Sequence, residues 1–102
     1  MTVIELSTYD DFERETNSNP RCVIMYGSAN CGHCIHFLPI FIENSKIYTN
    51  IKFYHVESTK IEIDNIVGYP TIVFYKNKEP YNSIIGADVD SFLSQLKKLS
   101  NM

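Results

Sequence analysis

The sequence predicts a single α/β domain over residues 1–102, with a central mixed β-sheet and helices on both of its faces. Short β-rich apolar segments alternate with segments of helical periodicity, which is typical of α/β proteins. The run Cys22 to Tyr26 is continuously apolar, so it predicts a central strand that is covered on both faces. A final pair of strands predicts an antiparallel hairpin at the edge of the sheet. A chain of 102 residues is long enough for one core.

The first half of the chain predicts two strands and two helices. Thr2 to Leu6 has the composition of a short strand. Thr8 and Asp11 have the spacing of a capping box, which predicts a short helix after them. After the central strand, a helical pattern runs from Cys34 to about Tyr48. Pro39 lies inside it, so we expect this helix to bend.

The second half predicts three more strands, at Ile51 to Glu57, Thr71 to Tyr75 and Tyr81 to Ile85. Thr59 to Ile66 predicts a short helix or turn between the first two. Asp88 is placed to cap a last helix. That helix has an apolar stripe made of Val89, Phe92, Leu93, Leu96 and Leu99.

Composition excludes several classes of function. The net charge is −3 and Lys and Arg do not cluster, so we expect no nucleic-acid and no membrane partner. No apolar run reaches the roughly 18 residues of a membrane span. The start of the chain lacks the pattern of a secretory signal, which favours the cytoplasm. Three cysteines in such a reducing compartment are not a disulfide scaffold.

Two cysteines separated by two residues, in the segment Cys31-Gly32-His33-Cys34, lie at the expected start of a helix. Side chains three apart in the first helical turn lie on one side, close enough for a disulfide. The free N–H groups of that turn favour a thiolate on Cys31. The pattern therefore indicates a disulfide that opens and closes reversibly. An imidazolium at His33 would stabilise the thiolate further and make the disulfide a better oxidant.

The chain resembles the thioredoxin superfamily over nearly its whole length. The resemblance rests on the apolar strand before the cysteines, the motif itself, and Pro39 five residues after the second cysteine. It also rests on Gly68-Tyr69-Pro70-Thr71 before another apolar strand, and on Gly86 ahead of the last helix. The Gly-His pair between the cysteines is that of protein disulfide isomerase domains, whereas thioredoxins usually carry Gly-Pro.

This resemblance implies a thioredoxin fold and a thiol–disulfide oxidoreductase that acts on protein disulfides. Cys31 would attack the substrate disulfide, and Cys34 would resolve the mixed disulfide. Pro70 is cis in the family and faces the cysteines, and the backbone before it, here Tyr69, pairs with an extended substrate.

The expected partners are protein disulfide or dithiol substrates, and a separate reductase or glutathione that restores the dithiol. No bound cofactor or metal is needed, because the cysteines carry the electrons. We expect the protein to be a monomer.

Three positions depart from the family pattern. Asn30 replaces a tryptophan, Gly27 replaces an aromatic residue, and Met25 replaces a buried acid. Because Asn30 and Gly27 replace large aromatic residues, we expect the rim around Cys31 to be open and polar. We expect Asn30 and Gly32 to contact the substrate. Met25 cannot accept a proton from the buried cysteine. His55 shares a strand face with the expected core, so it is our candidate for that base; the alternative is a structural histidine.

Two other functions remain open on the sequence alone. The first is a thioredoxin-like module that binds a partner or senses redox state and does not catalyse turnover. The loss of the tryptophan and the acid favours this alternative. Cys31 and Cys34 also have the spacing of half a zinc site, but the remaining candidates, Cys22, His33, His36 and His55, do not form a second pair at ligand spacing.

Overall fold

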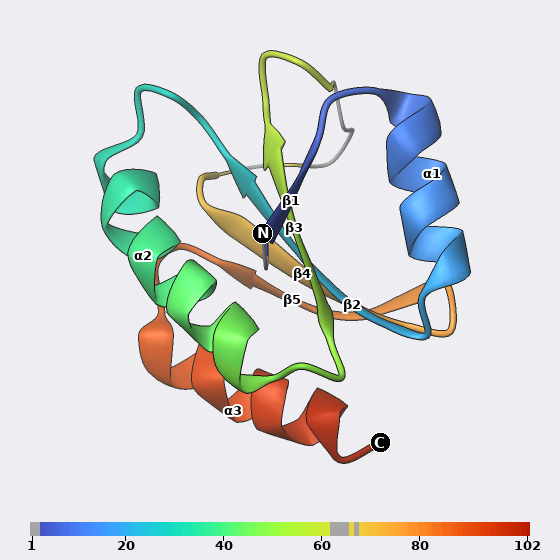
Figure 1. The fold of residues 1–102 in the computed structure, drawn as a ribbon. Helices are drawn as coiled ribbons and strands as arrows, with labels where there is room; N and C mark the ends of the chain where they lie inside the picture. Colours follow the sequence, from blue (N-terminus) through green and yellow to red (C-terminus); the bar gives the residue numbers. More distant parts are fainter. Residues whose placement is uncertain (1–2, 62–65, 67) are drawn as a thin grey trace.

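A computed structural model describes residues 3–61, 66 and 68–102 of the chain, and within them five strands form one sheet (Figure 1). The strands are β1 (Val3–Leu6), β2 (Arg21–Gly27), β3 (Lys52–Glu57), β4 (Thr71–Lys76) and β5 (Glu79–Ile85). The helices are α1 (Tyr9–Ser18), α2 (Gly32–Ile47) and α3 (Val89–Ser100). Figure 1 shows α1 on one side of the sheet and α2 and α3 on the other, so the predicted α/β architecture is confirmed.

The sheet is mixed, with the strand order β1-β3-β2-β4-β5. β3 pairs in parallel with both β1 and β2, whereas β4 runs antiparallel to β2 and β5 runs antiparallel to β4. Parallel neighbours need crossover connections, and α1 and α2 supply them on opposite faces. The short helix or turn predicted at Thr59 to Ile66 falls mostly outside the described residues, although residues 58–60 form a turn.

The central strand β2 is buried on both faces, as its apolar run predicted. Val23 and Met25 are fully buried in the cluster under α2 and α3. Cys22, Ile24 and Tyr26 point to the opposite face and join the cluster beside α1. Alternation along the strand therefore divides the core into two layers.

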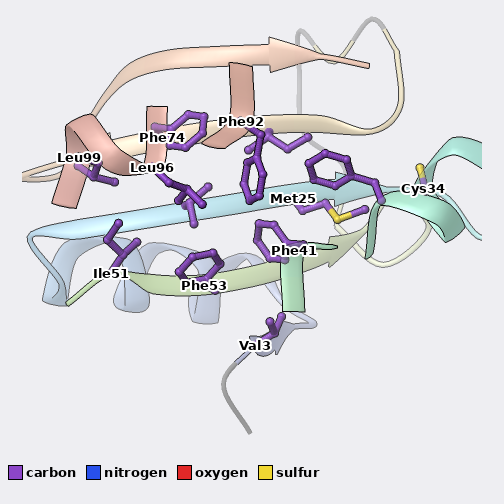
Figure 2. Packing of buried hydrophobic residues seen from close by; sticks show 13 residues of the cluster. Val3, Met25, Cys34, Phe41, Ile51, Phe53, Phe74, Phe92, Leu96 and Leu99 are labelled. Atoms are coloured by element: carbon purple, nitrogen blue, oxygen red, sulfur yellow. The ribbon is translucent and has the colours of Figure 1, made fainter. Parts of the chain in front are cut away.

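Aromatic rings fill the layer between the sheet and the helices α2 and α3 (Figure 2). The Phe92 ring of α3 lies 4.9 Å from the ring of Phe37 and 5.8 Å from that of Phe41, both on α2. Phe41 in turn contacts Phe53 of β3 edge-on, with ring centres 5.1 Å apart. These contacts fix α2, and with it the first turn that carries the cysteines, against the sheet.

Side-chain caps begin two of the helices at the predicted residues. The Thr8 hydroxyl accepts the backbone N–H of Asp11, and Asp88 accepts that of Ser91. The Asp11 carboxylate bonds to Arg14 at 2.7 Å rather than returning to Thr8, so the predicted capping box is half formed. Among the described residues, no helix is both long enough and apolar enough to cross a membrane.

Two element boundaries differ from the sequence prediction by two residues, and others differ by one. α2 begins at Gly32, two residues before the predicted start, because Cys31 itself caps the helix. β5 begins at Glu79 instead of Tyr81, because the hairpin turn contains only Asn77 and Lys78. Both of these residues have positive φ, 51° and 76°, as a two-residue turn that matches the strand twist requires.

Phe92→Ala should destabilise the protein by about 3–5 kcal/mol, since it removes a fully buried ring from the aromatic layer. Leu93→Ala is the matched control. Leu93 is the next residue on α3 and is 38% exposed, so its truncation should lower the stability by less than about 1 kcal/mol. Urea unfolding followed by circular dichroism measures both values. Equal losses for the two variants would contradict this assignment of the core.

Candidate redox site

Cys31 is the N-cap of α2 and the more accessible cysteine of the motif. Its backbone is extended, with φ −98° and ψ 112°, and its N–H donates to the Ser28 carbonyl at 3.1 Å. Its Sγ accepts the backbone N–H of Cys34 at 3.2 Å. The sulfur therefore occupies the place where a capping oxygen normally accepts a helix N–H, at the positive end of the helix dipole.

Cys34 lies one turn further along α2 and is buried, with 5% of its surface exposed. Burial raises the pKa of its thiol to about 11, and the hydrogen bond with Cys31 and the negative charge of Glu57 act in the same direction. At pH 7 the Cys34 thiol is therefore protonated in nearly all molecules. Cys34 therefore needs help to lose its proton.

Cys22 belongs to a different part of the core. It is fully buried on the α1 face of β2, and burial raises the pKa of its thiol to about 12. Its Sγ donates to the Asn19 carbonyl at 3.4 Å. This arrangement is that of a small apolar core residue.

The residues that resemblance assigned to substrate binding lie at the end of β2 from which the chain leads to Cys31. Tyr26 of β2 pairs with Thr71 of β4, so the residues just before β4 lie at this same end of the strands. The Tyr69–Pro70 peptide bond is cis, and the Pro70 carbonyl accepts the N–H of Gly86 at 2.8 Å. Tyr69 is 37% exposed, whereas Pro70 is buried.

The remaining motif residues are exposed around Cys31. Asn30 lies in the loop before it, and Gly32 and His33 form the first turn of α2. A methyl group at Gly32 would meet no atom within 4 Å, so the surface there is open.

One row of side chains crosses the sheet below the cysteines. Strand register places Glu5 of β1 beside His55 of β3, and His55 beside Met25 of β2. Residues directly opposite in neighbouring strands point to the same face. Met25 belongs to the layer under α2, so this row faces the helix that carries Cys34.

Glu5 and His55 are joined by a hydrogen-bond contact within this row. Nδ1 of His55 lies 2.6 Å from Oε1 and 2.8 Å from Oε2 of the Glu5 carboxylate. The His55 side chain is 14% exposed, whereas that of Glu5 is 55% exposed at the sheet edge. The carboxylate stays hydrated while it holds one edge of a mostly buried ring.

Gly27 leaves space between His55 and Cys34. A methyl group at this position would lie 3.1 Å from Nε2 of His55 and 3.7 Å from Sγ of Cys34. Both atoms therefore border the space over one glycine, and any side chain there would press on the imidazole. The sequence predicted only a more open rim from Gly27, whereas in the structure this glycine also leaves the space that Nε2 of His55 and Sγ of Cys34 both border.

A depression of about 140 Å³ lies beside this group. Its lining includes Cys34, His55 and Glu57, together with Ser28, Ala29, Ile35 and Leu38. Oε1 of Glu57 accepts the N–H of Ala29 at 3.3 Å. A water molecule entering this depression would meet the buried thiol and both ionisable side chains.

Sequence reasoning missed Glu5 and Glu57. Glu5 is two residues after Val3, a core residue, and so lies on the same face of β1. Glu57 lies on the same face of β3 as His55 and Phe53. The signal that could have identified them is a carboxylate at a strand position that faces the same side as core residues. Within the described residues, no three His, Cys, Asp or Glu side chains are grouped to hold a metal ion.

Comparison with known proteins places the chain in a family. The thioredoxin family model matches residues 3–98. Thioredoxin 1 of Plasmodium falciparum (isolate 3D7) is 31% identical over 90 residues, covering 84% of this chain and 86% of that protein. Thioredoxin of Malassezia sympodialis is 32% identical over 89 residues, covering 81% and 85%. The chain belongs to the thioredoxin family. The crystal structure of the Malassezia protein superposes with a TM-score of 0.85 at 28% identity, over 96% of this chain and 93% of that one.

The protein is therefore a thiol–disulfide oxidoreductase, as its cysteine motif predicted. Membership of the thioredoxin family also supports protein disulfides as substrates and a reductase as partner. The fold prediction is confirmed by the same comparison.

Alkylation should distinguish the three thiols of this protein. Brief treatment of the native reduced protein with iodoacetamide at pH 7 should label Cys31 alone, because Cys34 and Cys22 are buried and have pKa values raised to about 11 and 12. Peptide mass spectrometry locates the label, and the urea-unfolded protein, in which all three should react, is the control. Comparable labelling of Cys34 in the native protein would contradict the structure.

Proposed function

We propose that Cys31 is the nucleophile of this oxidoreductase and that Cys34 is the resolving cysteine. The observation that carries the proposal is the difference between the two positions: one sulfur lies half-exposed at the helix cap, and the other lies buried one turn inside. The Cys31 thiolate attacks a substrate disulfide and releases one substrate thiol. The Cys34 thiolate then attacks Sγ of Cys31 and releases the second.

We propose that Tyr69, Pro70, Asn30 and Gly32 contact the substrate. Tyr69, which is exposed just before β4, would offer its main-chain groups to an extended segment, which is recognition by strand addition. Such pairing depends on the substrate backbone more than on its sequence, so the enzyme should accept several protein disulfides.

His33 and His55 have separate roles in this proposal. His33 is exposed at the first turn of α2, next to Cys31, where an imidazolium stabilises the thiolate and raises the reduction potential of the Cys31–Cys34 pair. His55 serves as the base for Cys34. The space over Gly27, bordered by both its Nε2 and the Cys34 sulfur, supports this assignment.

We further propose a single-domain monomer that works in a reducing compartment such as the cytoplasm. A separate reductase or glutathione returns the Cys31–Cys34 disulfide to the dithiol. No bound cofactor or metal takes part, because the two sulfurs themselves carry the electron pair.

Substitution of each cysteine tests the assignment of roles. Cys34→Ser should accumulate a mixed disulfide with insulin as model substrate, because Cys31 can attack an insulin disulfide but no second cysteine resolves the product. Cys31→Ser is the matched control and should trap none. Mass spectrometry without reducing agent measures the adducts.

Equal trapping by both variants would reject the assignment of the nucleophile. Absence of trapping by either, together with wild-type protein that fails to reduce insulin, would favour a binding module without turnover.

A further inference from the structure

We propose that Glu5 is a positioning residue for the resolving step: it holds His55 so that Nε2 of the imidazole takes the proton from Cys34. This inference rests on the proposed role of His55 and adds a carboxylate on the edge strand β1. The result is a carboxylate–imidazole–thiol relay that crosses three elements, β1, β3 and α2.

The need for such a relay comes from the centre of the sheet. Met25 is fully buried next to His55 in the strand register, and a thioether cannot accept a proton. The buried Cys34 thiol has its pKa raised to about 11. Without a base, only the small fraction of molecules that carry the Cys34 thiolate can resolve the mixed disulfide, so resolution is slow.

The contact with Glu5 assigns the two nitrogens of His55 to different tasks. In the neutral ring one nitrogen carries the proton and the other bears a lone pair. Nδ1 lies 2.6–2.8 Å from both carboxylate oxygens, so its N–H donates to Glu5. Nε2 is then the bare acceptor, and it is the nitrogen that borders the space over Gly27.

The resolving step conserves protons and electrons. Nε2 of His55 takes the Cys34 proton, directly or through one water in the adjoining depression. The Cys34 thiolate attacks Sγ of Cys31, the Cys31–Cys34 bond forms, and the bond from Cys31 to the substrate sulfur breaks. Glu5 balances the positive charge that forms on the imidazole. The departing substrate thiolate takes a proton from solvent, and the imidazolium then returns its proton to solvent.

Glu57 is the rival base, because it also lines the depression beside Cys34. Its Oε1 accepts the N–H of Ala29 and, at 3.5 Å, that of Thr59, so the loop backbone already occupies this oxygen. Its negative charge also opposes a thiolate at Cys34. In the part of the chain that the structure describes, the titratable groups brought to His55 are thus Glu5 of β1, Glu57 of its own strand and Cys34 of α2.

Single-turnover reduction of insulin separates the first attack from resolution. Acid-quenched samples analysed by mass spectrometry report the mixed disulfide over time, from pH 6 to pH 9. His55→Ala should slow resolution by about 10²–10⁴-fold and make it rise about tenfold per pH unit, since only spontaneous thiolate then reacts. Glu5→Gln should slow it by about 10–100-fold, because the amide cannot stabilise the imidazolium. The first attack by Cys31 should stay within about twofold in both.

A double variant and three further single variants sharpen the test. Glu5→Gln should have no further effect in the His55→Ala background, because the carboxylate acts only through the imidazole. Gly27→Ala should also slow resolution, since its methyl group would lie 3.1 Å from Nε2. Glu79→Gln is the matched control, for it removes an exposed carboxylate from the opposite edge strand. Glu57→Gln tests the rival.

The outcomes are distinguishable. Wild-type resolution in Glu5→Gln, with slow resolution in His55→Ala, would overturn the inference and leave the role of His55 intact. A loss confined to Glu57→Gln would assign the base to Glu57 and overturn both. If Cys34→Ser traps no substrate, the proposed function itself fails. Thermal unfolding midpoints within a few degrees of wild type exclude loss of the fold as the cause.

Discussion

The burial of β2 on both faces is the constraint on which the rest of the structure depends. Every residue from Cys22 to Tyr26 is at most 3% exposed, so the strand needs an apolar layer on each side. α1 supplies part of one layer, and α2 and α3 supply the other (Figure 1). The same strand pairs with β3 and β4, and its end directs the chain into the first turn of α2.

This constraint also explains where the ionisable groups of the site lie. A carboxylate at the centre of β2 would have to be desolvated, which is costly unless it is paired. Here Met25 fills that position and Glu5 lies two strands away, where it remains half-exposed to water. His55 spans the distance between them, and Gly27 leaves room for its ring. The two departures from the family pattern, at positions 25 and 27, thus fit the proposed relay as one set.

Much of the fold was predictable because it depends on local patterns. Continuous apolarity identified β2, the helical stripe identified the buried face of α3, and Thr8 and Asp88 marked two helix starts. The pairing of Glu5 with His55 was not predictable, since it depends on the register between β1 and β3, fifty residues apart. The sequence identified His55 as a candidate base from its strand face and from the resemblance to the family. The structure was needed to show that Glu5 holds the ring and that Nε2 borders the space over Gly27, because both depend on the arrangement of three strands.

The tautomer of His55 tests the central claim most directly. Nitrogen-15 NMR of the reduced protein, followed from pH 6 to pH 9 with His55 assigned by comparison with His55→Ala, reports which ring nitrogen keeps its proton in the neutral form. The proposed relay predicts a proton on Nδ1, held by Glu5, and a bare Nε2 toward Cys34; in Glu5→Gln that preference should weaken. A neutral ring protonated on Nε2 in the wild-type protein would contradict it.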